Sequence, residues 1–143
     1  MKKTFFFIMV ILGFISLPDT GCKSDVAGPN PADTTKPVDL TKPLNILYPK
    51  GGETYKVNQT VRVRWQINDS TKIGSVRIDL SLDRGKTFPI TFISPSGGSF
   101  SRNITQYDWK IENASISDSC VIKVREYNEG SLNDRSGVFS IRQ

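Results

Sequence analysis

Between residues 44 and 142, short runs of alternating apolar and polar residues are separated by turn residues, and this period of two limits the fold most strongly. A period of two places every second side chain on one face of a β-strand, whereas an amphipathic helix needs a period near 3.6. In TVRVRWQI (residues 60–67), the valines, Trp65 and the isoleucine share one face, while Arg62 and Arg64 share the other. The pattern therefore predicts strands rather than helices.

Seven such runs predict seven strands, which cover residues 44–48, 60–67, 75–82, 87–93, 106–111, 119–127 and 137–142. Seven evenly spaced strands in about 100 residues favour an all-β, antiparallel β-sandwich of immunoglobulin or fibronectin type III shape. The fibronectin-like core is the better match, because the cysteine pair of antibody domains is missing. Trp65 and Trp109 are expected to contribute most to this core, since truncating either to Ala costs about 3 to 5 kcal/mol.

Five sequence blocks carry a resemblance to a known family: ILYPKGGETYKVNQTVRVRW, VRIDLSLDRGKTF, YDWKI, CVIKV and DRSGVFSI. In this order they resemble the β-sandwich domain of the Kre9/Knh-type, Ser/Thr-rich GPI-anchored wall proteins. Bacterial members of that family are surface proteins and lipoproteins. The resemblance covers residues 44–142 and implies an immunoglobulin-like fold, an extracellular setting and a link to cell-wall glucan assembly. It carries over no catalytic residue.

Residues 1–21 are predicted to be a signal peptide and are left out of the fold. Lys2 and Lys3 precede a mostly apolar run, residues 5–17. This run is too short to cross a bilayer, which needs about 20 residues. A positive start followed by a short apolar segment and small residues is typical of an export signal.

Cys22 is the predicted site of lipidation. It follows Thr20 and Gly21, which end the signal as in a bacterial lipoprotein, although Asp19 stands where an apolar residue is usual. The cysteine is required because its thiolate takes the diacylglyceryl group, and two or more acyl chains give stable anchoring. Ordinary secretion is the alternative. The overlapping LPDTG matches a sortase signal, but it precedes the domain, whereas sortase substrates carry the motif near the C-terminus.

Residues 22–42 are predicted to be a disordered tether, and residues 43–143 form the domain. The tether is rich in Pro, Asp, Thr and Lys and has no apolar period, so it buries too little surface to order itself. Loss of residues 1–21 removes two lysines and one aspartate, which lowers the net charge from +5 to +4. The charges of both signs are scattered, so the clustered basic footprint of a nucleic-acid-binding protein is missing.

No motif points to catalysis, so we expect no enzyme, no cofactor and no metal site, and a small hydrolase is the alternative. The chain contains no histidine, which removes the commonest general base and metal ligand. Asp79 and Asp108 lie on outward faces, and no spacing pairs them as glycoside hydrolysis requires. Cys120 lies in a strand-like run, where a lone cysteine packs as a small hydrophobe. A reactive thiol and a disulfide with Cys22 are the alternatives.

Residues 81–88 read S-x-D-x-G-x-T-F, which matches the Asp-box of sialidases and related propellers. A propeller repeats this box, but here it occurs once in a domain too small for several blades. We therefore interpret it as a structural turn. In this turn Asp83 accepts hydrogen bonds from backbone N–H groups, Gly85 permits a positive φ angle, and Phe88 packs underneath the turn.

Binding is the remaining class of function, because the loops of a sandwich are held rigidly and carry recognition. The residues of the candidate ligand site are Tyr55, Phe100 and Tyr127, which either stack on sugars or pack in the core. We also expect an outward row of cations that either binds acidic glycans or phosphates or pairs with Asp79, Asp108 or Glu126. The residues of this row are Arg62, Arg64, Lys123 and Arg125.

The sequence as a whole predicts a bacterial envelope lipoprotein at the outer membrane or cell surface. Its lipid holds it on the membrane, and it presents a non-catalytic β-sandwich as a binding or structural module. The alternative is a carbohydrate-binding module in cell-wall or extracellular glycan assembly. The expected partners are the membrane, glycans and other envelope proteins.

Overall fold

The computed structural model describes residues 35–92, 94–95 and 97–143. The predicted signal peptide (1–21), Cys22 and the first part of the tether lie outside these residues. Within the described ranges the chain forms ten β-strands and one 3-10 turn, η1 (Asn113–Ser115). None of the helical structure found there is long and apolar enough to span a membrane.

Each of the seven predicted runs overlaps a strand of the structure. These are β1 (Leu44–Tyr48), β3 (Thr60–Ile67), β4 (Ser75–Ser81), β5 (Ile90–Phe92), β7 (Gln106–Lys110), β8 (Ser117–Glu126) and β10 (Phe139–Arg142). Three more short strands were not predicted: β2 (Thr54–Lys56), β6 (Phe100–Ser101) and β9 (Asn133–Arg135). With only two or three residues each, they are too short to show a period of their own.

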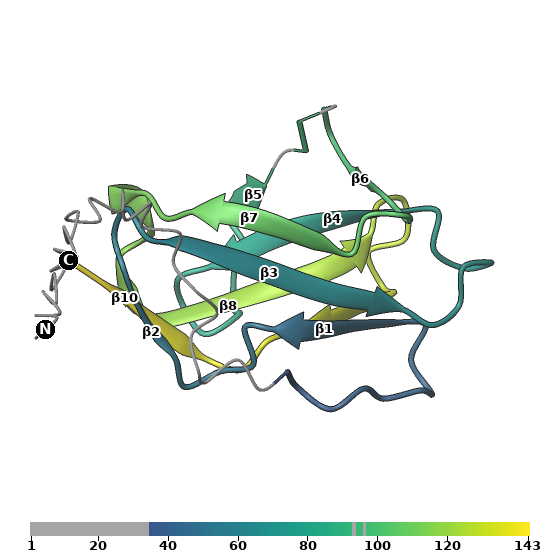
Figure 1. Ribbon diagram of the computed structural model, residues 1–143, viewed down its shortest axis with the longest axis horizontal. Helices are drawn as coiled ribbons and strands as arrows, with labels where there is room; N and C mark the ends of the chain where they lie inside the picture. The colour runs from purple at the N-terminus through teal and green to yellow at the C-terminus, as the bar shows by residue number, and fades with distance from the viewer. Residues whose placement is uncertain (1–34, 93, 96) are drawn as a thin grey trace, which may run out of the picture.

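The strands form two sheets that lie in layers (Figure 1). One sheet has the order β1-β3-β7, and the other has the order β2-β10-β8-β4-β5, with β6 on β4 and β9 on β8. Pairing is antiparallel except between β2 and β10, which run parallel. The larger sheet is therefore mixed, whereas the sequence predicts antiparallel pairing throughout. The fold is all-β and consistent with a β-sandwich.

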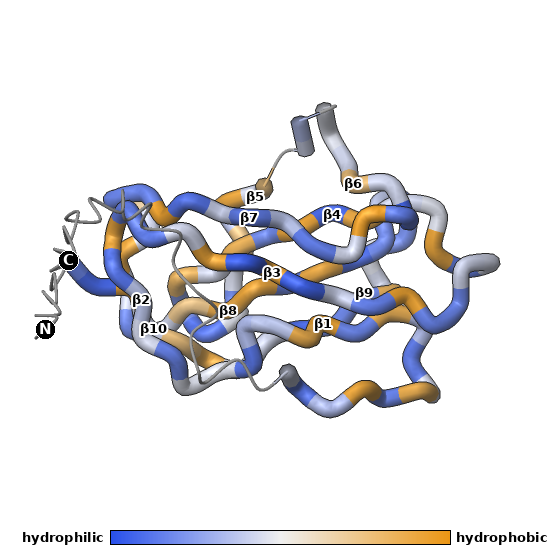
Figure 2. Tube along the Cα trace, viewed as in Figure 1, coloured by the Kyte–Doolittle hydropathy of each residue, from blue (hydrophilic) through white to orange (hydrophobic). Residues whose placement is uncertain are grey.

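A single hydrophobic core fills the space between the sheets. The alternation predicted for β3 is confirmed, since Val61, Val63 and Trp65 are buried, and Figure 2 shows alternating blue and orange stretches along the strands. Both tryptophans are in this core: Trp65 lies 5.8 Å from the ring of Phe100, and Trp109 lies 4.9 Å from that of Phe92.

Two glycines allow the turn after β1 to touch the chain before β10. Gly137 N–H donates to the carbonyl oxygen of Lys50 at 2.9 Å, and Gly52 N–H donates to the carbonyl oxygen of Val138 at 2.7 Å. A Cβ atom on Gly137 would lie 2.6 Å from the Lys50 oxygen, and one on Gly51 would lie 2.6 Å from Gly137 Cα. Only glycine fits at this crossing.

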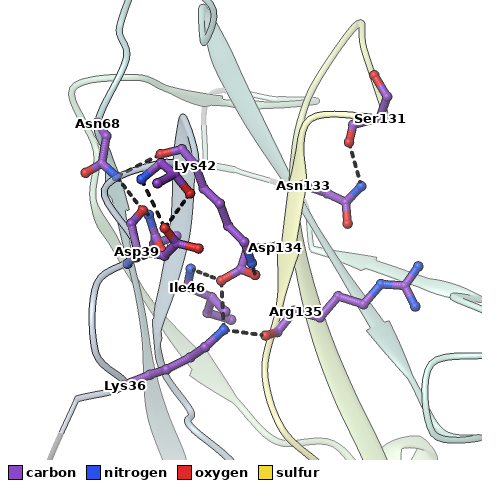
Figure 3. Close-up of polar contacts among 11 residues, drawn as sticks. Lys36, Asp39, Lys42, Ile46, Asn68, Ser131, Asn133, Asp134 and Arg135 are labelled. Carbon is purple, nitrogen blue, oxygen red and sulfur yellow. Dashed lines mark hydrogen bonds and ion pairs between the residues drawn. The ribbon is translucent and has the colours of Figure 1, made fainter.

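The last eight residues of the predicted tether, residues 35–42, lie against the domain and are called the N-terminal clasp below (Figure 3). The backbone N–H of Lys36 donates to the carbonyl oxygen of Leu47 at 2.8 Å. The backbone N–H and carbonyl of Asp39 each form a hydrogen bond of 2.9 Å with the side chain of Asn45. The ammonium groups of Lys36 and Lys42 reach Asp134 on β9. A buried carboxylate from a distant strand thus binds both lysines of the clasp.

Candidate functional site

Two of the three candidate ligand residues belong to the core. Tyr55 is only 2% exposed, and its ring packs 5.6 Å from that of Phe139. Phe100 is 1% exposed and packs against Trp65 and Tyr107. A ring enclosed between two sheets has no face left for a sugar. Tyr55 and Phe100 therefore pack in the core and do not stack on a ligand. Tyr127, in contrast, is 42% exposed directly after β8.

The predicted row of four cations is divided between the two sheets. Arg62 and Arg64 lie on β3, while Lys123 and Arg125 lie on β8 of the other sheet. The pairs therefore belong to opposite outer faces of the molecule. Arg62 binds Asp108 on the neighbouring strand through two hydrogen bonds of 2.7 and 3.0 Å. This hydrogen-bonded pair lowers the pKa of Asp108.

Asp79 is the centre of the charged groups on the outer face of the larger sheet. It points outward from β4 as predicted, but it is only 4% exposed. Arg125 Nε donates to one carboxylate oxygen at 2.9 Å, and Thr91 Oγ1 donates to the other at 2.8 Å. Arg77 Nε and Lys123 Nζ lie 3.4 and 3.7 Å away. Side chains from three adjacent strands surround the carboxylate, because β4 pairs with both β5 and β8.

We call Arg77, Asp79, Lys123, Arg125 and Arg135 the cationic face. Arg135 joins it from β9, where it pairs in register with Lys123. Burial lowers the pKa of Lys123, and the nearby Arg125 and Arg135 lower it further, against the opposing effect of Asp79. Three of these cations contact the Asp79 carboxylate and Arg135 lies beside Lys123, so these five residues carry a net charge of +3. Unneutralised positive charge of this kind attracts anions.

Aromatic side chains lie at both ends of the cationic face. At one end, the ring centroid of Phe88 lies 3.9 Å from Lys123 Nζ and 5.1 Å from Arg135 Cζ, which is the geometry of cation–π contacts. At the other end, the exposed Tyr127 comes directly after the last residue of β8. Arg125 Nη1 also donates to the Tyr127 carbonyl at 3.4 Å.

The turn of residues 81–88 brings Phe88 to this position. The Asp83 carboxylate accepts hydrogen bonds from the backbone N–H groups of Lys86 at 3.1 Å and Thr87 at 2.9 Å. Gly85 has φ +80°, as the predicted turn requires. Hydrogen bonds from Ser81 and then Thr87 hold the pKa of Asp83 well below its usual range. The Asp-box motif thus builds a stable charged turn beside the cationic face.

Cys120 has the environment of a packing residue. It is fully buried, and burial raises the pKa of its thiol to about 11. A thiol that stays protonated at neutral pH is a poor nucleophile. No group of three or more His, Cys, Asp or Glu residues that could hold a metal occurs in the part of the chain that the structure describes.

Two residues of the cationic face are absent from the predicted row. Arg77 shares its outward face of β4 with Asp79, but its neighbours on β8 are nearly fifty residues away in sequence. Arg135 lies on β9, a strand too short to be predicted. Alternation places Arg77 outward, but only the register of β4 with β8 brings it beside Arg125.

The fold and the site thus define an all-β domain with a basic, aromatic-flanked outer face. Comparisons of the chain with protein-family models, with curated proteins and with solved structures gave no match. The resemblance to the Kre9/Knh-type proteins stays a prediction.

Proposed function

We propose that this protein is a bacterial envelope lipoprotein, anchored through Cys22, whose non-catalytic domain binds acidic glycans of the wall or extracellular space. The single observation that carries the proposal is the cationic face, where Arg77, Lys123 and Arg125 surround the buried carboxylate of Asp79 and Arg135 lies beside Lys123. We further propose that the domain is a fibronectin-like sandwich related to the Kre9/Knh-type proteins. The seven alternating runs and the five sequence blocks support that assignment.

The chemistry of the cationic face favours acidic polymers over small neutral ligands. Guanidinium groups bind carboxylate, sulfate or phosphate through paired hydrogen bonds. Aromatic rings such as Tyr127 and Phe88 offer apolar surface to the faces of sugar rings. Because Lys123 and Arg125 are only 17% and 19% exposed, the more exposed Arg77 and Arg135 would make the first contacts with a polymer.

A binding assay tests the face directly. The purified full chain is titrated with polygalacturonate, an acidic polymer, and with neutral dextran. Replacing Arg77 and Arg135 by Gln should weaken binding to polygalacturonate about tenfold or more, since each lost hydrogen bond to a charged group is worth about 1.5 to 3 kcal/mol. Binding should also weaken as salt is added.

The matched control is Arg142→Gln, which removes an exposed cation that pairs with Asp118 away from the cationic face. This variant should bind as the unchanged chain does. Equal affinity for dextran and polygalacturonate would sink the acidic-glycan proposal. Full binding by the Arg77 and Arg135 double variant would exclude the cationic face as the site. Failure of the chain to bind either polymer would leave the structural-module role.

The anchor is tested separately. Cys22→Ser should move the protein from the membrane fraction to the soluble fraction, because the lipid acceptor is lost. Cys120→Ser is the control, because it removes the buried thiol and leaves the anchor; it should stay with the membrane. Retention of the Cys22→Ser protein on membranes would contradict the proposed lipid anchor.

A further inference from the structure

A polar cavity of about 590 Å³ opens on the outer face of the three-stranded sheet, on the other side of the molecule from the cationic face. Its volume lies within the range of about 300 to 1,000 Å³ that is usual for small-ligand sites. Arg64 and Gln66 of β3 and Gln106 of β7 form one side. Arg102 and Asn103, in the loop between β6 and β7, form another.

Strand pairing holds the first side together. Arg64 lies directly opposite Gln106 in the antiparallel pair β3–β7, and Gln66 follows Arg64 by two residues on the same face. The amide nitrogen of Gln66 donates to Asn68 Oδ1 at 2.9 Å. A guanidinium and two amides are therefore presented from sheet positions, which are more rigid than loop positions.

Arg102 links the loop between β6 and β7 to the loop between β3 and β4, which contains Ser70. Its Nη1 donates to the carbonyl oxygen of Ser70 at 3.2 Å. Ser70 and Thr105 add hydroxyl groups to the lining. Among the described lining residues there are two guanidiniums, three side-chain amides and two hydroxyls but no carboxylate, so the cavity has a net positive charge.

This set of groups selects a chemical class of ligand. Guanidinium groups prefer carboxylates, which they bind through two parallel hydrogen bonds. Side-chain amides and hydroxyls both donate and accept hydrogen bonds, as the hydroxyl groups of a sugar require. The lining is more polar than apolar, with Leu47, Trp65 and Ile67 as its apolar members. A cation would find no carboxylate to bind it.

We propose that this cavity is a second binding site, which takes a short oligosaccharide with a uronate unit. The carboxylate pairs with Arg102 and Arg64, and the amides bind the ring hydroxyls. The cavity and the cationic face share no residue, so this proposal can be tested independently of the cationic face.

The experiment is calorimetric titration of the full chain with trigalacturonate, and with the neutral galactose trimer as reference. Trigalacturonate should bind at least about tenfold more tightly than the neutral trimer. Arg102→Gln and Gln106→Ala should each weaken that binding severalfold. Both positions are exposed, so these variants should keep the fold, which a thermal melt checks.

Arg142→Gln, which lies on neither the cationic face nor the cavity, is the matched control and should bind the trimer unchanged. No binding of trigalacturonate, equal binding of the neutral trimer, or full binding by Arg102→Gln would each overturn the second site. Loss of trimer binding in Arg77→Gln alone would assign the uronate to the cationic face. The cavity proposal would then fail while the acidic-glycan function remained.

Discussion

Asp134→Asn is the substitution with the clearest expected effect on stability, because it leaves the shape of a buried side chain and removes its charge. The Asp134 side chain is only 6% exposed. It accepts hydrogen bonds from Lys36 at 2.9 Å, from Lys42 at 2.8 Å and from the backbone N–H of Ile46 at 3.0 Å. The asparagine keeps one acceptor oxygen, but it turns an N–H group toward at least one ammonium. The N-terminal clasp should then loosen.

The size of the loss follows from these contacts. A hydrogen bond to a charged group is worth about 1.5 to 3 kcal/mol, but exposed ion pairs are worth about 0 to 1 kcal/mol. The side chains of Lys36 and Lys42 are 33% and 44% exposed, so each contact lies between these limits. We expect a total loss of about 2 kcal/mol. For a domain of this size that corresponds to a fall in Tm of about 8 to 16 °C.

Urea denaturation followed by the fluorescence of Trp65 and Trp109 measures this loss, because both rings are buried. The control is Asp118→Asn, whose carboxylate is 68% exposed and pairs with Arg142 on the surface. That variant should lose less than about 0.5 kcal/mol. Equal losses in the two variants, or a loss below about 0.5 kcal/mol for Asp134→Asn, would refute the buried-carboxylate argument.

The pH dependence gives a second check on Asp134. Burial raises the pKa of this carboxyl, but hydrogen bonds from Lys42 and Lys36 and from Ile46 outweigh it, so the pKa in the fold lies below the ordinary 3.8. A group with a lowered pKa contributes stability above its unfolded pKa and loses that contribution as the pH falls through the folded value. The stability gap between the unchanged chain and Asp134→Asn should therefore persist at neutral pH and close below about pH 4.

Two further predictions concern packing. Gly137→Ala should cost about 1 to 3 kcal/mol in the same urea assay, since its Cβ would lie 2.6 Å from the Lys50 oxygen; Gly74→Ala, with open space around it, is the control, and equal stability of the two variants would contradict the close approach. Cys120 should resist iodoacetamide at pH 7.5 in the folded chain and react in urea, because burial raises its pKa to about 11; rapid alkylation of the folded protein would show an accessible thiol.

The positions of the long strands could be predicted from the sequence because burial repeats along each of them. Trp65 and Trp109 lie in the core as the period of two requires. Tyr55 shows the limit of this reasoning. It lies on β2, a strand of three residues with burial on its middle position alone, and one buried residue makes no pattern. Its position depends on parallel pairing with β10, far along the chain.

The environment of Asp79 could not be predicted for a related reason. Alternation correctly places its side chain outward on β4, but an outward residue is solvated only if its neighbours leave it open. The register places Thr91 beside Asp79 on one strand and Lys123 on the other, with Arg125 close by. These partners come from distant segments, so the burial of the carboxylate follows from tertiary pairing and leaves no local signal in the sequence.

The N-terminal clasp contacts residues near both candidate binding surfaces, which raises the question of whether it controls them. Lys36 Nζ donates to the Arg135 carbonyl at 3.2 Å, and Asn68, which holds Gln66, also donates to the Lys42 carbonyl at 2.8 Å. However, β3 is paired on both sides, by β1 and β7, and β9 is paired with β8, so the backbones of both surfaces are fixed without the clasp.

Loosening the clasp should therefore leave binding nearly unchanged. Asp134→Asn should lower stability but alter the affinity for trigalacturonate by no more than about twofold, which is the range expected for independent sites. The measurement is the same calorimetric titration, made well below the Tm of the variant. A loss of affinity as large as that of Arg102→Gln would mean that the clasp and the cavity act as one unit, linked through Asn68 and Gln66.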